Sequence, residues 1–161
     1  MGSQYTPGQR TFSKLLVDGV ERSFIVYTPS NYDGSPFGLL IAIHGFTSNS
    51  STMELRTDFN RFAQEKQYIV LYPDGLDRSW NAGGCCGMSA IRKVDDVSAI
   101  MAIKNHMEHQ LCLDRARSMV TGHSNGGMVS TRGRWRPACL PHALLHRGRC
   151  GPNARACTAW V

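Results

Sequence analysis

The order of apolar and polar residues divides the first 130 residues into predicted strands and helices. Residues 11–17 and 22–28 have strand composition, and the Asp18-Gly19 pair between them is typical of a hairpin turn. Residues 38–43 and 68–72 are almost entirely apolar, as expected of strands that are buried on both faces of a parallel sheet. A short strand over residues 117–121, ending at Gly122, completes the predicted sheet.

A helix is predicted between the two buried strands, over residues 52–66. Ser51 and Glu54 have the spacing of a capping box at its start. Apolar residues then recur at helical intervals toward one face, at Leu55, Phe59, Phe62 and Ala63.

A second amphipathic helix is predicted from Val94 to Ile103, after a long loop of small residues over 74–93. Asp95 and Asp96 fall in its first turn, where acidic side chains interact favourably with the helix dipole, and we interpret both as capping residues. The alternation of strands and helices predicts an α/β domain with right-handed crossovers.

Composition supports one globular domain but shows a break along the chain. The chain has 161 residues, 42% of them hydrophobic, and no run of eighteen apolar residues, so a membrane span is excluded. The net charge of +6 suggests an anionic partner, yet six of the 18 basic residues lie after residue 131, which leaves 12 to balance all 12 acids in residues 1–130. We therefore predict a flexible start (1–10), the first part of an α/β domain (11–130) and an Arg-rich tail (131–161).

The chemistry is concentrated at Gly122-His123-Ser124-Asn125-Gly126, which fits the G-x-S-x-G nucleophile elbow between a strand and a helix. Small residues are needed on either side because the turn brings backbones close together. Ser124 is the predicted nucleophile, and the N–H of Asn125 is a predicted oxyanion donor. A merely structural Gly-Ser turn is the alternative.

His44-Gly45 ends the strand over residues 38–43, where this type of enzyme places the loop with the second oxyanion donor. We predict that donor to be the N–H of Phe46. His44 is interpreted mainly as a side chain that bonds loop backbone and shapes the turn, with contact to substrate as the alternative.

Six motifs now carry a family resemblance: 43–45 (IHG), 72–75 (YPDG), 80–81 (WN), 84–87 (GCCG), 94–97 (VDDV) and 121–128 (TGHSNGGM). In order and spacing they resemble the polyhydroxybutyrate depolymerase/feruloyl esterase group of α/β-hydrolases, which includes the LpqC-like esterases. The resemblance covers about residues 11–130. It implies an α/β-hydrolase fold with a mostly parallel sheet and an N-terminal antiparallel hairpin.

The resemblance also implies a function. It implies a serine esterase that forms an acyl-enzyme on Ser124 and cleaves feruloyl or acetyl esters of plant polysaccharide, or polyhydroxyalkanoate esters. No cofactor, metal, nucleic acid or membrane partner is implied. His44 and Trp80 are expected near the substrate, with loop packing as the alternative for Trp80. Secretion is implied too, although no export signal is visible at Met1.

The cysteines of the 84–87 motif commonly form disulfides in that group. Adjacent cysteines seldom bridge each other, so Cys85 and Cys86 would each need a distant partner, and Cys112 is the one other cysteine before the tail. Reduced, buried thiols are the alternative.

The expected ending of the domain is missing. An α/β-hydrolase orders its triad as serine, acid and histidine, so Asp95 and Asp96 come too early, and no acid follows Ser124. Only His142 and His146 follow, and the tail has the composition of a frame-shifted, GC-rich reading. We therefore expect an aberrant end with an unprotected sheet edge. Three alternatives remain: zinc held by Cys139, His142, His146 and Cys150; arginines that bind nucleic acid; or an inactive binding module.

Overall fold

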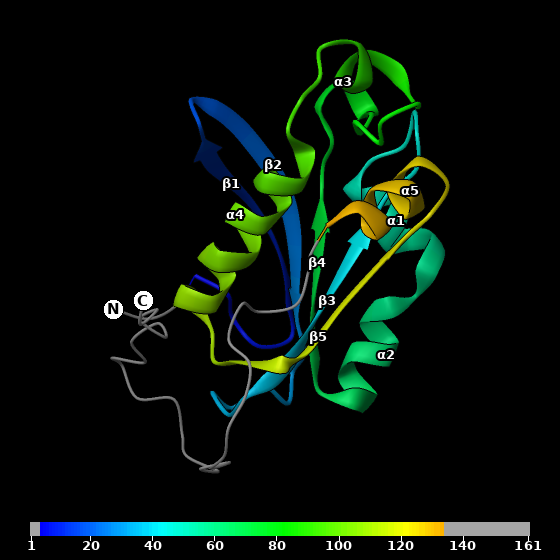
Figure 1. The fold of residues 1–161 in the computed structure, drawn as a ribbon. Helices are drawn as coiled ribbons and strands as arrows, with labels where there is room; N and C mark the ends of the chain where they lie inside the picture. The colour runs from blue at the N-terminus through cyan, green and yellow to red at the C-terminus, as the bar shows by residue number, and fades with distance from the viewer. Residues whose placement is uncertain (1–3, 134–161) are drawn as a thin grey trace.

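The computed structural model describes residues 4–133, which form one five-stranded mixed sheet (Figure 1). Its strands lie in the order β1-β2-β4-β3-β5. They are β1 (Gln9–Val17), β2 (Val20–Thr28), β3 (Phe37–Ile43), β4 (Tyr68–Pro73) and β5 (Leu113–Gly122). The β1–β2 and β2–β4 pairs are antiparallel, whereas β3 pairs in parallel with both β4 and β5. The predicted hairpin and the predicted α/β architecture are confirmed.

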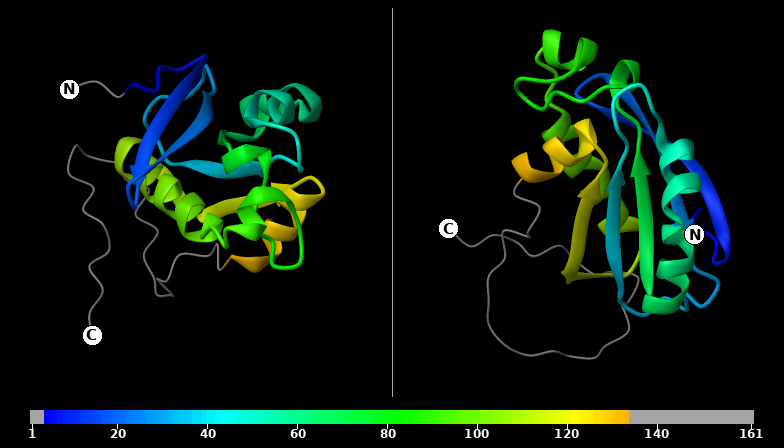
Figure 2. Two further views of the ribbon diagram at one scale, coloured as in Figure 1. Left: turned by 90° about the horizontal axis from the view of Figure 1, so that it is seen from above. Right: turned by 90° about the vertical axis from the view of Figure 1, so that its right-hand side faces the viewer.

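Helices cover both faces of the sheet (Figure 2). On one face lie α1 (Ser50–Thr57) and α2 (Phe59–Lys66), and on the other α4 (Asp96–Gln110) and α5 (Asn125–Arg132). Alternate residues of β3 enter two separate cores: Leu39, Ile41 and Ile43 pack in the α4–α5 core, Leu40 and Ala42 in the α1–α2 core. This two-sided burial explains why the sequence of β3 is an unbroken apolar run.

The helical segment after β3 differs from the prediction. Instead of one helix over residues 52–66, the chain forms α1 and α2, which meet at Asp58 in a left-handed conformation (φ 51°). Leu55 is 85% exposed, so it does not belong to the buried face. The predicted capping box at Ser51 and Glu54 is also wrong. The cap of α1 is Asn49, whose side chain accepts a hydrogen bond from Thr52 N.

The connection from β4 to α4 is more ordered than the predicted loop. It holds the 3₁₀ helix η1 (Leu76–Arg78) and the short helix α3 (Gly87–Ile91). No helix within residues 4–133 is long and apolar enough to cross a bilayer.

The topology itself indicates where a ligand would bind. The chain leaves β3 through α1 and α2 on one face to reach β4, and leaves β4 through α4 on the opposite face to reach β5, which lies on the other side of β3. In such sheets ligands bind beyond the carboxyl ends of the strands, where the order of strands reverses. Here that point lies at the carboxyl ends of β3 and β5.

Candidate active site at the ends of β3 and β5

Ser124 occupies a strained turn between β5 and α5. Its backbone has φ 51° and ψ −118°, a region that residues with a side chain rarely adopt. The flanking glycines make the turn possible. A Cβ on Gly122 would lie 2.4 Å from the carbonyl of Gly126, and a Cβ on Gly126 would lie 2.3 Å from the carbonyl oxygens of Ile43 and His44. The local geometry is therefore the one predicted for a nucleophile elbow.

The loop after β3 lies directly beside this elbow. A Cβ on Gly45 would be 3.5 Å from Cβ of Ser124, so the loop passes close to the serine at the residue before Phe46. Within the described part of the chain, neither the N–H of Phe46 nor that of Asn125 donates a hydrogen bond. Asn125 is the first residue of α5, so its N–H has no acceptor inside the helix. Two backbone donors are therefore available beside Ser124.

His44 and Trp80 lie beneath this loop surface. His44 is fully buried; its Nδ1 is 2.7 Å from the carbonyl oxygen of Gly45, and its Nε2 accepts a hydrogen bond from Gly75 N at 3.0 Å. Trp80 is 1% exposed, its ring packs on His44, and its Nε1 donates to the His44 carbonyl at 2.9 Å. With both ring nitrogens of His44 engaged and both side chains covered, direct contact of either with substrate does not fit.

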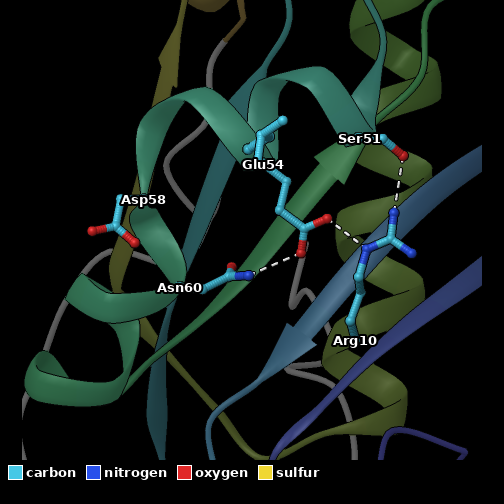
Figure 3. Close-up of a pocket in the computed structure, with 6 residues that line it drawn as sticks. Arg10, Ser51, Glu54, Asp58 and Asn60 are labelled. Atoms are coloured by element: carbon cyan, nitrogen blue, oxygen red, sulfur yellow. Dashed lines mark hydrogen bonds and ion pairs between the residues drawn. The ribbon is translucent and has the colours of Figure 1, made fainter.

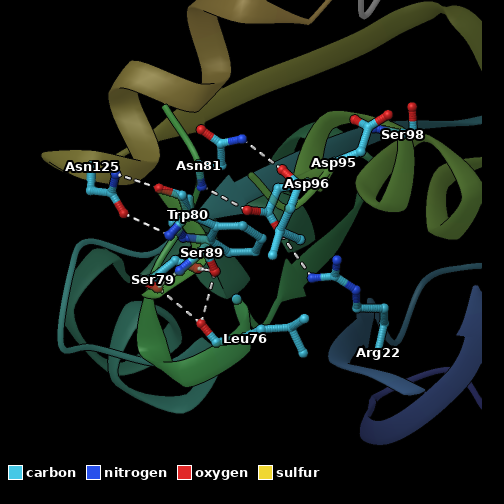
Figure 4. A network of polar contacts seen from close by, with 12 residues as sticks. Arg22, Leu76, Ser79, Trp80, Asn81, Ser89, Asp95, Asp96, Ser98 and Asn125 are labelled. Atoms are coloured by element: carbon cyan, nitrogen blue, oxygen red, sulfur yellow. Dashed lines mark hydrogen bonds and ion pairs between the residues drawn. The ribbon is translucent and has the colours of Figure 1, made fainter. Parts of the chain in front are cut away.

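A buried ion pair supports the segment that carries Trp80 (Figure 4). Arg22 of β2 donates to Asp96 of α4 at 2.8 Å, and both side chains are at most 5% exposed. The second carboxylate oxygen of Asp96 accepts from Asn81 N at 2.7 Å. Burial raises the pKa of Asp96, and the bonds from Asn81 and Arg22 oppose that rise.

The capping interpretation therefore holds for one of the two acids. Asp95 is the cap of α4 and accepts a hydrogen bond from Ser98 N, whereas Asp96 ties three segments together. The sequence contains no local signal for this role, because Arg22 lies 74 residues away.

Solved structures share this fold. The acetyl xylan esterase of Aspergillus awamori matches with a TM-score of 0.63 at 19% identity, over 76% of this chain and 45% of the esterase. The serine hydrolase FphF of Staphylococcus aureus matches with a TM-score of 0.57 at 24% identity, over 75% of this chain and 49% of that chain. This chain has an α/β-hydrolase fold.

Relatives of this chain in sequence are esterases by name. A probable feruloyl esterase C of Aspergillus flavus is 29% identical over 127 residues, which are 71% of this chain and 43% of the esterase. The bifunctional acetylxylan esterase/xylanase XynS20E of Neocallimastix patriciarum is 29% identical over 115 residues, which are 70% of this chain and 16% of that enzyme. The chain thus spans less than half the length of these relatives. No protein-family model matches it.

These relatives agree with the feruloyl esterase side of the predicted resemblance. The polyhydroxybutyrate depolymerase side stays a prediction. The chain is thus similar in sequence to carboxylic ester hydrolases.

Several predicted features of the chain fall outside the described residues. These are most of the Arg-rich tail, the candidate zinc ligands in it, and the two histidines that follow Ser124 in sequence, His142 and His146. Within residues 4–133 no group of three or more histidine, cysteine, aspartate or glutamate side chains could hold a metal ion. The prediction of separate, distant partners for Cys85 and Cys86 is wrong, because these two cysteines form a disulfide with each other.

A surface hollow lies apart from the elbow, between the start of β1 and helices α1 and α2 (Figure 3). At about 460 Å³ it could admit a small molecule. Its polar groups already bind one another, however: Arg10 donates to Glu54 and Ser51, and Asn60 donates to Glu54. We interpret it as a structural network that joins β1 to α1.

Burial of His44 predicts a loss of stability in acid. Burial lowers the pKa of His44, and its hydrogen bond with Gly45 only partly opposes this. In the unfolded chain the pKa of this histidine is about 6.5. Below that pH the unfolded chain therefore binds more protons than the folded chain, and the free energy of unfolding falls as pH decreases. We expect urea denaturation to show lower stability at pH 5.5 than at pH 7.5.

His106 is the control for this measurement, because burial lowers its pKa too and acts in the same direction. Part of the acid-induced loss should remain in His106→Asn, where His44 still titrates. Equal stability of that variant at both pH values would contradict the role given to His44.

Proposed function

We propose that this chain carries the nucleophile and the oxyanion-binding half of a serine carboxylic-ester hydrolase. The observation that supports this most strongly is Ser124 at φ 51°, held between two glycines whose positions leave no space for a Cβ. A strained turn of this kind is useful for catalysis, because it exposes the serine Oγ at the end of the sheet.

In the proposed reaction, Oγ of Ser124 attacks the ester carbonyl carbon. The carbonyl oxygen becomes an oxyanion, which accepts hydrogen bonds from the N–H groups of Phe46 and Asn125. The serine proton passes through a general base to the departing alcohol, leaving an acyl-enzyme on Ser124. Water then attacks the acyl carbonyl and releases the acid. No metal or cofactor takes part in these steps.

Exposed apolar side chains near the elbow offer a surface for the acyl group. Phe46 is 45% exposed, and its ring lies against Gly87, where a Cβ would be 2.6 Å from Cε2 of the ring. Met88 and Ile91 of α3, the helix that begins at Gly87, are exposed as well. In the proposed site Phe46 therefore contacts the acyl group in place of Trp80, which was expected near the substrate. This surface suits a feruloyl or acetyl ester of the kind named in the relatives. Secretion stays a prediction.

Covalent labelling tests the nucleophile without requiring full turnover. A fluorophosphonate probe should react with Ser124: Oγ bonds to phosphorus, fluoride leaves, and the label appears on the tryptic peptide 118–132. Ser130→Ala is a matched control, because Ser130 lies in the same peptide and its Oγ donates to the Gly127 carbonyl. We expect labelling to persist in Ser130→Ala and to vanish in Ser124→Ala.

Hydrolysis of p-nitrophenyl acetate and methyl ferulate provides the second measurement. Release of product above the blank should disappear in Ser124→Ala and remain in Ser130→Ala. A folded wild-type chain that is neither labelled at Ser124 nor active on either ester would identify an inactive binding module instead.

A further inference from the structure

We propose that the side chain of Asn125 is a positioning residue that, together with Trp80, sets the spacing between the two oxyanion donors. This inference rests on the proposed function and adds a role for two residues that do not react. The name "Trp80–Asn125 clamp" is used below for these two residues and the hydrogen bonds described next.

The Asn125 amide pairs with both backbone groups of Trp80. Its Oδ1 accepts from Trp80 N at 2.9 Å, and its Nδ2 donates to the Trp80 carbonyl at 3.0 Å (Figure 4). Nδ2 also lies 3.4 Å from the carbonyl oxygen of Cys85. Because Asn125 is fully buried, water cannot replace these partners. A side-chain amide supplies one acceptor and a donor group in a fixed plane, which a carboxylate or hydroxyl cannot reproduce at neutral pH.

Trp80 extends the connection to the other donor. Its indole Nε1 donates to the carbonyl of His44 at 2.9 Å, two residues before Phe46. One residue is thus bonded through its backbone to the elbow and through its side chain to the loop after β3. The clamp therefore connects the peptide that presents the Asn125 N–H with the loop that presents the Phe46 N–H.

The segment that carries the clamp is itself bonded to neighbouring elements. The backbone N–H of Asn81, the next residue, donates to the carboxylate of Asp96, and its side-chain Nδ2 donates to the Val94 carbonyl at 2.8 Å. Since Asp96 is paired with Arg22, the segment that carries Trp80 is fixed to β2 and α4. This support makes Trp80 a rigid reference point for both donors.

The expected consequence is a loss in turnover that exceeds the loss in substrate binding. Removing an oxyanion donor costs about 10²- to 10³-fold in kcat, so a displaced donor should cost at least about 10-fold. In Asn125→Asp the carboxylate faces the Trp80 and Cys85 carbonyls, so at pH 8 we expect kcat for p-nitrophenyl acetate to fall about 10-fold or more with little change in KM.

The pH profile of Asn125→Asp gives a sharper test. Burial and the facing carbonyl oxygens should raise the pKa of the new carboxyl group. Once protonated, that group can donate to the Trp80 carbonyl as the amide does, so the ratio of variant to wild-type kcat should recover as pH falls from 8 to 5. A ratio that stays constant over this range would overturn the clamp as the cause of the loss.

Tyr72→Phe is the matched control for general destabilisation. It removes a hydrogen bond of 2.9 Å to Asn60 from a fully buried residue in the core on the opposite face of the sheet. It should lower stability and leave kcat unchanged. If Asn125→Asp behaves in the same way, Asn125 is structural and the proposal is wrong. Should Asn125→Asp fail to fold, Trp80→Phe removes the bond to His44 and part of the buried ring but keeps the backbone bonds to Asn125, and it should lower kcat at unchanged KM.

Hydrogen exchange separates this inference from the proposed function. If Ser124→Ala is as active as the wild type, the proposed function is wrong whatever Asn125 does. The clamp itself is then judged by the Trp80 amide in Asn125→Leu, which has no side-chain acceptor for that N–H; its exchange should become faster there than in Tyr72→Phe. Unchanged protection of that amide would contradict the proposed clamp even if Ser124 is the nucleophile.

Discussion

Asp96→Asn is expected to lower the free energy of unfolding by about 3 kcal/mol. Asp96 and Arg22 are 2.8 Å apart with side chains at most 5% exposed, so the variant leaves a guanidinium buried without its counter-charge. Breaking such a pair from one side typically costs about 3–5 kcal/mol, and an amide that keeps some of the hydrogen bonding should fall at the lower end. Urea denaturation at pH 7.5 measures the change, provided that the slope with urea is unchanged.

Glu21→Gln is the control for this prediction, because it breaks an ion pair with Lys14 in which both side chains are more than half exposed. Exposed pairs contribute about 0–1 kcal/mol, so this variant should remain close to the wild type. Equal losses in the two variants would show that the buried pair has no special role. The double variant Arg22→Met/Asp96→Asn should recover part of the loss, because no unpaired charge remains and the Asn side chain can still accept from Asn81 N.

Local patterns were sufficient for the strands and for the elbow. The Asp18-Gly19 turn defines the β1–β2 register without help from the rest of the chain, and the apolar run of β3 follows from burial on both faces. The glycines around Ser124 are required by contacts within a few residues and by the neighbouring end of β3. Each of these patterns occupies a few consecutive residues, so the sequence shows it even where, as at Gly126, the contact that requires it comes from the distant end of β3.

Other features depended on partners that are distant in sequence. Ser51 and Glu54 match a capping box, but Arg10, more than 40 residues earlier, binds both side chains, and the helix starts at the cap supplied by Asn49. Asp96 stands at a position typical of a helix cap, but Arg22 donates a hydrogen bond to its carboxylate.

The same limit applies to His44 and Trp80. Their residue types suggest a binding surface, whereas their hydrogen bonds place them under the loop. No periodicity or motif reports such contacts, so only the folded arrangement reveals which polar residue supports the site and which one faces it.

Gly126→Ala should show how strictly that arrangement controls the proposed chemistry. A Cβ at this position would lie 2.3 Å from the carbonyl oxygens of Ile43 and His44, which are backbone atoms and cannot rotate away. The end of β3 and the elbow must then separate. Overpacking of this kind costs about 1–3 kcal/mol, and the gain in helix propensity offsets about 1 kcal/mol of it. The larger effect should be catalytic, because a shift of about 1 Å between Ser124 and the Phe46 N–H can reduce the rate about 100-fold.

Gly84→Ala and Gly127→Ala make this measurement selective. A Cβ on Gly84 has no neighbour within 4 Å, and one on Gly127 would be 3.0 Å from the Gly122 carbonyl oxygen. For p-nitrophenyl acetate we therefore expect kcat/KM to be unchanged in Gly84→Ala, moderately reduced in Gly127→Ala and reduced about 100-fold in Gly126→Ala. Activity in Gly126→Ala equal to that in Gly84→Ala would mean that the close contact between β3 and the elbow does not hold the reacting groups in place. The loss must also exceed the fraction of unfolded protein measured by denaturation, since only then does it report the geometry of the site.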